Sequence, residues 1–266
     1  MKQLHADYGD LAAARPIDVD TPGGAEQVAR HAESFGFAVA RPGTAADSPE
    51  EVLGHLAEVL ELGAPHMPGT AHLESNTSPY KHVINAMAPE GWHVDGLLEQ
   101  LGTVRTTALY CVRPALRGGA TALFNSIAAY GELRRTDPEA ADTLLAPTVL
   151  TRHAMLLTGG YGEGITGPAF AVADDGTVST RYSDNHTCTW DRSVGTDGSL
   201  DRALEFLRKA AHESRYRVDV RLDAGEVLLL RNDRLAHDRM PFEEDPAAPR
   251  QLVRALYTRP PQARRN

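Results

Sequence analysis

The chain has 266 residues, of which 42% are hydrophobic and 24% are charged, a composition that suits one globular domain with a large core. Lys and Arg number 27 against 36 Asp and Glu, and the net charge of −9 argues against nucleic acid or an anionic membrane as a partner. The sequence lacks the run of roughly 18 to 20 apolar residues that a membrane helix needs, and its N-terminus lacks the apolar stretch of a signal peptide. We therefore expect a cytoplasmic protein.

The first predicted elements are two helices with a strand between them. Helical apolar spacing within Gly23–Gly36 predicts a helix, and the next residues predict a short strand that ends before Pro42. Ser48 can cap a second helix that runs to about Leu62, with Pro49 in its first turn. The chain thus opens as helix, strand, helix.

A long loop follows the second helix. Residues 65–79 are rich in Gly, Pro, Ser, Thr and Asn, and long loops in compact domains often cover functional sites. We expect an active-site lid near 64–82 and loose ends at 1–12 and 260–266. The absence of repeats and linkers predicts a single domain over 1–266. A homo-oligomer is a possible state, since most soluble oligomers are symmetric assemblies of one chain, but no feature of the sequence indicates it.

The remainder of the chain is dominated by short predicted strands. Helices are expected at 125–135, 138–145 and 199–213, and they interrupt the strands without alternating with them. This order favours an antiparallel sandwich or barrel with flanking helices over a doubly wound parallel sheet. The predicted strands lie at 82–87, 104–112, 120–124, 148–157, 169–173, 177–183, 216–222, 226–230 and 251–258.

A histidine and an aspartate two residues apart form the first candidate site. If Trp92–Asp95 is extended, His93 and Asp95 point to the same face and present an imidazole beside a carboxylate. Such a tripeptide also arises by chance, so an ordinary hydrogen-bonded strand histidine is the alternative. His237 lies 144 residues further on, after an apolar strand. Two histidines and one carboxylate suit Fe(II) with open positions, although zinc hydrolases use the same ligands.

The region after His237 is unusually basic for an acidic protein. Residues 231–259 contain six arginines, whose planar guanidinium groups suit carboxylate ligands. Arg250 and Arg254 share one face of a predicted strand, and a hairpin could return them toward the metal ligands. Surface arginines on an edge strand are the alternative. Thr121, after the Gly118-Gly119 turn, could add a hydroxyl group to a carboxylate site.

Four stretches in this order resemble the family of taurine dioxygenase and 2,4-dichlorophenoxyacetate dioxygenase. They are WHVD, GGAT, NDRLAHDRMPF and RQLVRALY, and the likeness spans roughly 35–257. The resemblance implies a mostly β fold with flanking helices, the double-stranded β-helix or jelly roll. It also implies an oxygenase that uses Fe(II), 2-oxoglutarate and O2, with His93, Asp95 and His237 as iron ligands.

The resemblance further implies roles for three other residues. Arg250 would pair with the distal carboxylate of 2-oxoglutarate, helped by Thr121, and Arg254 would lie near the keto-acid end or the substrate. The segment between His237 and Arg250 is longer than in taurine dioxygenase, and Asp238 stands where many relatives have glycine. Hydroxylation is the expected reaction, with release of succinate and CO2. Halogenation is disfavoured because Asp95 would fill the position that a chloride needs.

Polar residues near two predicted strands are the candidates for substrate contact. Arg181, Tyr182 and Asp184 follow one strand, and Asn85 lies on the strand before His93. We expect a small polar metabolite, such as an amino acid or a derivative in specialised biosynthesis. Two other functions stay open: a metal-dependent hydrolase or isomerase with the same ligands, and a non-catalytic jelly roll that senses a carboxylate.

Overall fold

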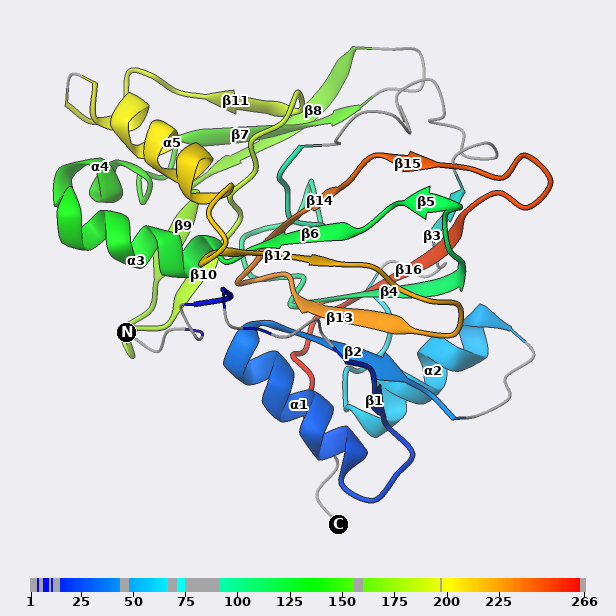
Figure 1. Ribbon diagram of the computed structural model, residues 1–266. Helices are drawn as coiled ribbons and strands as arrows, with labels where there is room; N and C mark the ends of the chain where they lie inside the picture. Colours follow the sequence, from blue (N-terminus) through cyan, green and yellow to red (C-terminus); the bar gives the residue numbers. More distant parts are fainter. Residues whose placement is uncertain are drawn as a thin grey trace.

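The computed structural model describes residues 4, 7–9, 11, 15–43, 48–66, 71–74, 91–155, 160–196 and 198–263. Strands form two facing sheets of a barrel, with helices outside them (Figure 1). The strands are β1 (Ile17–Asp18), β2 (Phe37–Arg41), β3 (Ala71–Glu74), β4 (Thr106–Arg113), β5 (Arg117–Gly118), β6 (Thr121–Phe124), β7 (Leu150–Met155), β8 (Tyr161–Gly167), β9 (Phe170–Val172), β10 (Val178–Thr180), β11 (Cys188–Trp190), β12 (Arg217–Val220), β13 (Val227–Arg231), β14 (Ala236–Arg239), β15 (Phe242–Glu243) and β16 (Gln251–Tyr257). The helices are α1 (Gly24–Phe35), α2 (Pro49–Val59), α3 (Ser126–Thr136), α4 (Pro138–Thr143) and α5 (Ser199–Ala210).

The larger sheet has six strands in the order β1-β2-β13-β4-β16-β3, and the facing sheet has the order β12-β6-β14. Every pairing in both sheets is antiparallel except that of β1 with β2. Two smaller sheets, β11-β7-β8 and β10-β9, extend from one end of the barrel beside α3 to α5. The predicted mostly β jelly roll with flanking helices is confirmed.

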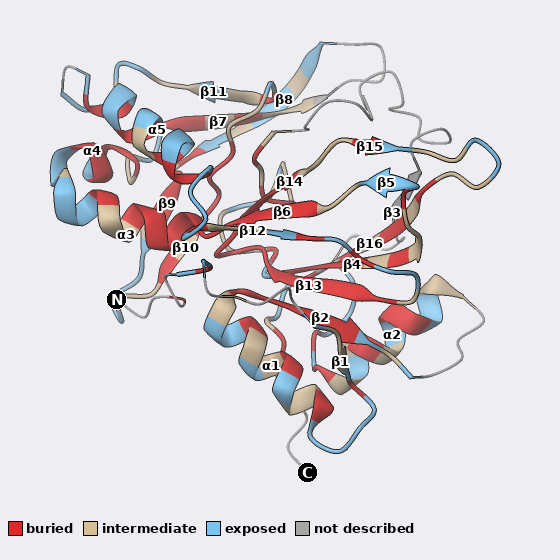
Figure 2. Cartoon of the chain, in the orientation of Figure 1, coloured by how far each residue is buried: buried red, intermediate tan, exposed pale blue. Residues whose placement is uncertain are grey.

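Alternation along β13 explains how this strand supports two cores. Val227 and Leu229 pack with α1 and α2, while Leu228 and Leu230 point into the other core with α3 and α5. A strand covered on both faces can therefore be apolar at every position. Figure 2 shows the matching pattern in the helices: their sheet-facing sides are buried and their outer sides are exposed.

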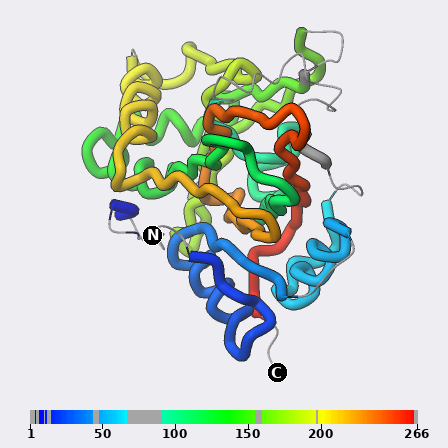
Figure 3. The backbone as a smooth tube through the Cα atoms, turned by 45° about the vertical axis from the view of Figure 1, so that its right-hand side comes forward, coloured from blue at the N-terminus to red at the C-terminus, as the bar shows by residue number. Residues whose placement is uncertain are grey.

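The helices cover different sides of the barrel. In the turned view of Figure 3, α1 and α2 (blue) lie below the strands, and α5 (yellow) lies to one side. Ser48 caps α2 by accepting a hydrogen bond from the Glu51 backbone N–H at 3.2 Å, as the sequence predicts. Asn125 caps α3 in the same way through Ala128 N at 3.2 Å. Among the described residues, no helix is long and apolar enough to cross a membrane.

Several described residues of the predicted loose ends contact the rest of the protein. Leu4 and Tyr8 are buried, and the Tyr8 ring packs edge-on against Phe37 with 5.9 Å between centroids. At the other end, Pro261 is buried and Gln262 N donates to Leu60 O at 2.9 Å. Burial of the apolar side chains of Leu4, Tyr8 and Pro261 stabilises these contacts.

Several strands were not predicted, and part of the predicted lid is a strand. β8 is glycine-rich and largely exposed, so it lacks the apolar alternation that marks a strand. β14 contains His237 in a polar stretch. Within 64–82, β3 pairs with β16, and the rest of the expected lid beyond residue 66 lies outside the described residues. The predicted strand at 82–87 also lies outside them, so the lid stays a prediction.

Candidate metal centre

The backbone brings His93 and His237 together. The two residues form an isolated antiparallel bridge, in which His93 N donates to His237 O at 3.0 Å and His237 N donates to His93 O at 2.8 Å. β14 positions His237 by pairing it with Leu123 of β6. The imidazole centroids lie 4.3 Å apart. One ligand atom each from His93, Asp95 and His237 lies within 4.8 Å of the others.

The turn before His93 fixes the orientation of its ring. His93 Nδ1 lies 2.8 Å from Gly91 O, and this contact leaves Nε2 as the atom for a metal. Gly91 has a φ of 93°, and a Cβ there would lie 2.6 Å from the Cβ of Asn185, so only glycine fits. Gly91 N donates to Asp238 Oδ1 at 2.8 Å. Asp238, which departs from the residue expected in many relatives, therefore helps to hold the turn.

Asp95 is the buried carboxylate of the centre. Thr107 Oγ1 donates to its Oδ2 at 2.8 Å, Arg254 Nη1 lies 2.5 Å from its Oδ1, and His237 Nε2 lies 3.7 Å from Oδ2. Burial alone would raise the pKa of Asp95, but the charges of Arg254 and of the two histidines, with the Thr107 hydrogen bond, together hold this pKa far below its usual range. The carboxylate is therefore ionised and ready to bind a cation.

Asn232 holds the backbone around Asp95 and is a residue that the sequence analysis missed. Asp95 N donates to Asn232 Oδ1 at 2.7 Å, and Asn232 Nδ2 donates to Asp95 O at 3.1 Å and to Val104 O at 3.0 Å. Asn232 lies in the polar turn after β13, only five residues before His237. In the sequence, the only indication of this role was the position of Asn232, a polar residue at the end of a buried apolar strand.

These residues fit a divalent transition metal. Two imidazoles and one ionised carboxylate on one side of a metal leave positions for other ligands, which is the donor set of non-haem Fe(II) oxygenases. The backbone contacts of His93 and Asp95 orient the ligands before a metal binds.

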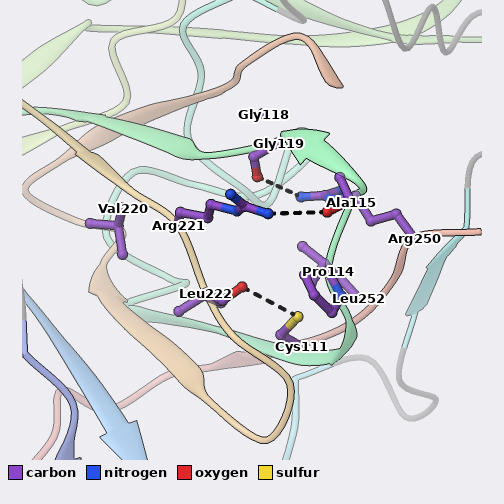
Figure 4. A pocket seen from close by; sticks show the side chains of 10 residues that line it. All are labelled: Cys111, Pro114, Ala115, Gly118, Gly119, Val220, Arg221, Leu222, Arg250 and Leu252. Carbon is purple, nitrogen blue, oxygen red and sulfur yellow. Dashed lines mark hydrogen bonds between the residues drawn. The ribbon is translucent and has the colours of Figure 1, made fainter. Parts of the chain in front are cut away.

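The residues predicted to bind 2-oxoglutarate lie along the same barrel interior. Thr121 is buried on β6, on the strand face shared with Leu123 and therefore with His237. Arg250 is also buried, and its Nη2 donates to Gly119 O at 3.3 Å. Figure 4 shows the side chain of Arg250 beside Gly119, in a pocket that Cys111 also lines. The assignment of Thr121 and Arg250 to the cosubstrate stays a prediction.

The five predicted substrate residues are Asn85, Arg181, Tyr182, Asp184 and Arg254, and Arg254 lies beside Asp95. Tyr182 is fully buried among core aromatic rings, including Phe124 at 5.9 Å, and its role in substrate contact stays a prediction. Asp184 is paired with Arg208 of α5, with distances of 2.7 and 3.0 Å. Arg181 is buried and lines a small hollow that also borders Asp95. Asn85 lies outside the described residues.

The sequence is similar to a known protein family and to two curated proteins. The model of the taurine catabolism dioxygenase TauD, TfdA family matches residues 3–256. A uridine-5'-phosphate dioxygenase from Amycolatopsis sp is 43% identical, with 99% of each chain covered. Another from Streptomyces sp is 39% identical, with 86% of this chain and 88% of the relative covered.

Solved structures show the same fold at lower identity. The non-haem iron oxygenase OrfP, in complex with Fe and α-ketoglutaric acid, has a TM-score of 0.65 and 19% identity, covering 89% of this chain and 80% of its own. PvcB, an Fe, α-ketoglutarate dependent oxygenase from an isonitrile synthetic pathway, has a TM-score of 0.63 and 16% identity, covering 91% and 82%. The chain therefore belongs to the TauD/TfdA family and is an Fe(II)- and 2-oxoglutarate-dependent dioxygenase.

Proposed function

We propose that this enzyme oxidises a C–H bond of uridine 5'-phosphate. The observation that carries the proposal is the 43% identity to a uridine-5'-phosphate dioxygenase over 99% of both chains. A second relative with the same name, at 39% identity, supports it. These relatives favour a nucleotide over the amino acid suggested by the sequence analysis. The family also favours the oxygenase over the hydrolase and sensor alternatives.

A nucleotide substrate is compatible with the acidic chain. The net charge of −9 disfavours polyanions because they contact a wide surface, but a mononucleotide meets only the charges of its own site. Around the metal centre those charges include Arg254 beside Asp95 and Arg250 in the barrel. Both co-reactants in the proposed reaction are anions, so local positive charge favours their binding.

In the proposed reaction each protein group has a task that follows from its contacts. His93, Asp95 and His237 hold the iron, and Thr107 and Arg254 keep Asp95 ionised and oriented. Arg250 and Thr121 bind the distal carboxylate of 2-oxoglutarate. Bound Fe(II), with 2-oxoglutarate and O2, supplies the oxidising power for attack on an unactivated C–H bond. Hydroxylation balances as substrate, O2 and 2-oxoglutarate giving hydroxylated substrate, succinate and CO2.

Succinate release tests the proposal directly. The enzyme with Fe(II), 2-oxoglutarate and O2 is supplied with uridine 5'-phosphate, uridine, cytidine 5'-phosphate or a panel of amino acids. We expect succinate and oxidised nucleotide in equal amounts with uridine 5'-phosphate. His237→Ala should abolish this release, while His212→Ala, which removes an exposed histidine after α5, should retain it. Turnover of an amino acid with none of the nucleotide would refute the proposal.

A further inference from the structure

Two arginines near the metal centre are buried without an acidic partner among the described residues. Arg152 on β7 and Arg181 after β10 are each 3% exposed. Two other buried arginines have such partners: Arg231 pairs with Asp233 at 3.0 Å, and Arg234 lies 3.5 Å from Glu33. A buried charge is unfavourable unless it is paired, so two unpaired guanidinium groups need an explanation.

Backbone contacts satisfy only part of each guanidinium group. Arg152 Nη2 donates to Val94 O at 2.6 Å, and Arg181 Nη2 donates to Ile165 O at 2.7 Å. The Nε–H of both side chains is buried and has no hydrogen-bond partner. Each guanidinium has five N–H donors, so both retain capacity for an anion. Cys188 lies near both arginines and forms a hydrogen bond with Arg152, which uses one of these donors.

The two arginines are neighbours. Burial lowers the pKa of Arg152, and the positive charge of Arg181 also lowers it, while Cys188 and the carboxylate of Asp95 act in the opposite direction. Two like charges that repel each other inside a protein are stabilised by an anion placed between them. The pair therefore has the charge, and the free donors, of an anion site.

A small hollow connects this pair to the metal centre. Arg152, Arg181 and Thr180 line one part of it, and Asp95 and Asn232 line another. The remaining wall comes mainly from residues 96–104. Glu99 also lines this wall, and its carboxylate lies 2.9 Å from His66 Nε2. An anion here would lie next to an iron ligand.

We propose that Arg152 and Arg181 bind the phosphate group of the substrate nucleotide. The inference rests on the proposed function, because it assigns one part of that substrate to a site. A phosphate monoester offers several acceptor oxygens, and planar guanidinium groups can each donate two parallel hydrogen bonds to it. Asp95 already has Arg254 and the metal as partners, so the phosphate would compensate the two remaining charges.

Binding of paired ligands to paired variants tests the assignment. Dissociation constants for uridine 5'-phosphate, uridine and inorganic phosphate are measured calorimetrically, without oxygen, on enzyme loaded with Fe(II) and 2-oxoglutarate. The variants are Arg152→Gln and Arg181→Gln. Arg135→Gln is the matched control, because Arg135 lies on α3 with an exposed side chain. Arg152→Lys and Arg181→Lys keep the charge and carry the test if a glutamine variant fails to fold.

We expect each glutamine variant to bind uridine 5'-phosphate at least about tenfold more weakly, the usual effect of losing hydrogen bonds to a charged group. Uridine affinity should change less than about twofold, and the lysine variants should show a smaller loss that is also confined to phosphorylated ligands. If the arginines served folding alone, their replacement would weaken the binding of uridine 5'-phosphate and of uridine equally. That result would overturn the assignment, and so would an unchanged affinity for uridine 5'-phosphate. Wild-type enzyme that binds inorganic phosphate through these arginines but not uridine 5'-phosphate would refute the proposed substrate and leave an anion site.

Discussion

The hydrogen bonds between Asn232 and the backbone around Asp95 lead to a quantitative prediction for both stability and iron binding. Asn232→Ala removes an acceptor for Asp95 N and a donor to Asp95 O and Val104 O, all in a buried setting. A buried polar group that loses its partner costs about 1–3 kcal/mol. Because the space left by the side chain can admit water, which recovers part of this cost, we expect the free energy of unfolding to fall by about 2–4 kcal/mol.

The second effect concerns the metal. Asn232 fixes the backbone of an iron ligand, and loss of such outer partners typically weakens metal affinity about 10–100-fold. Urea denaturation of the metal-free protein gives the first quantity, and Fe(II) titration without oxygen gives the second. Asn125→Ala is the matched control, because it removes the buried cap of α3 and should lower stability by about 1 kcal/mol while keeping iron affinity. If Asn232→Ala leaves the iron affinity unchanged, Asn232 does not position Asp95 for iron binding.

Three other predictions concern single side chains. Thr107→Val removes the hydroxyl group that donates to Asp95, so Fe(II) affinity should fall about tenfold in the same titration, and an unchanged affinity would contradict a role for this hydrogen bond. Gly91→Ala should lower the denaturation midpoint, because its φ of 93° disfavours alanine and the new Cβ would overlap Asn185; a variant as stable as the wild type would show that the turn can relax. Burial raises the pKa of the Cys111 thiol to about 11, so iodoacetamide at pH 8 should leave Cys111 unmodified in folded protein and alkylate it after denaturation, as peptide mass spectrometry can determine.

The sequence alone was sufficient to predict the fold class and the three side chains that the structure brings together as candidate metal ligands. Alternating apolar residues and turn residues predict most of the strands, because burial on one or both sheet faces imposes these patterns locally. His93 and Asp95 are two residues apart, so an extended backbone places them on one face without any distant contact. For His237 the decisive information was the order of four motifs that resemble one family.

The supporting residues depended on the tertiary structure. Asn232 and Asp95 are 137 positions apart, and Arg152 and Val94 are 58 apart, so no local pattern links them. The polar neighbours of Tyr182 suggested a loop, whereas packing encloses its ring in the core. Periodicity reports which face of a strand is buried, but the partner of a buried polar group is decided only when distant segments pack together.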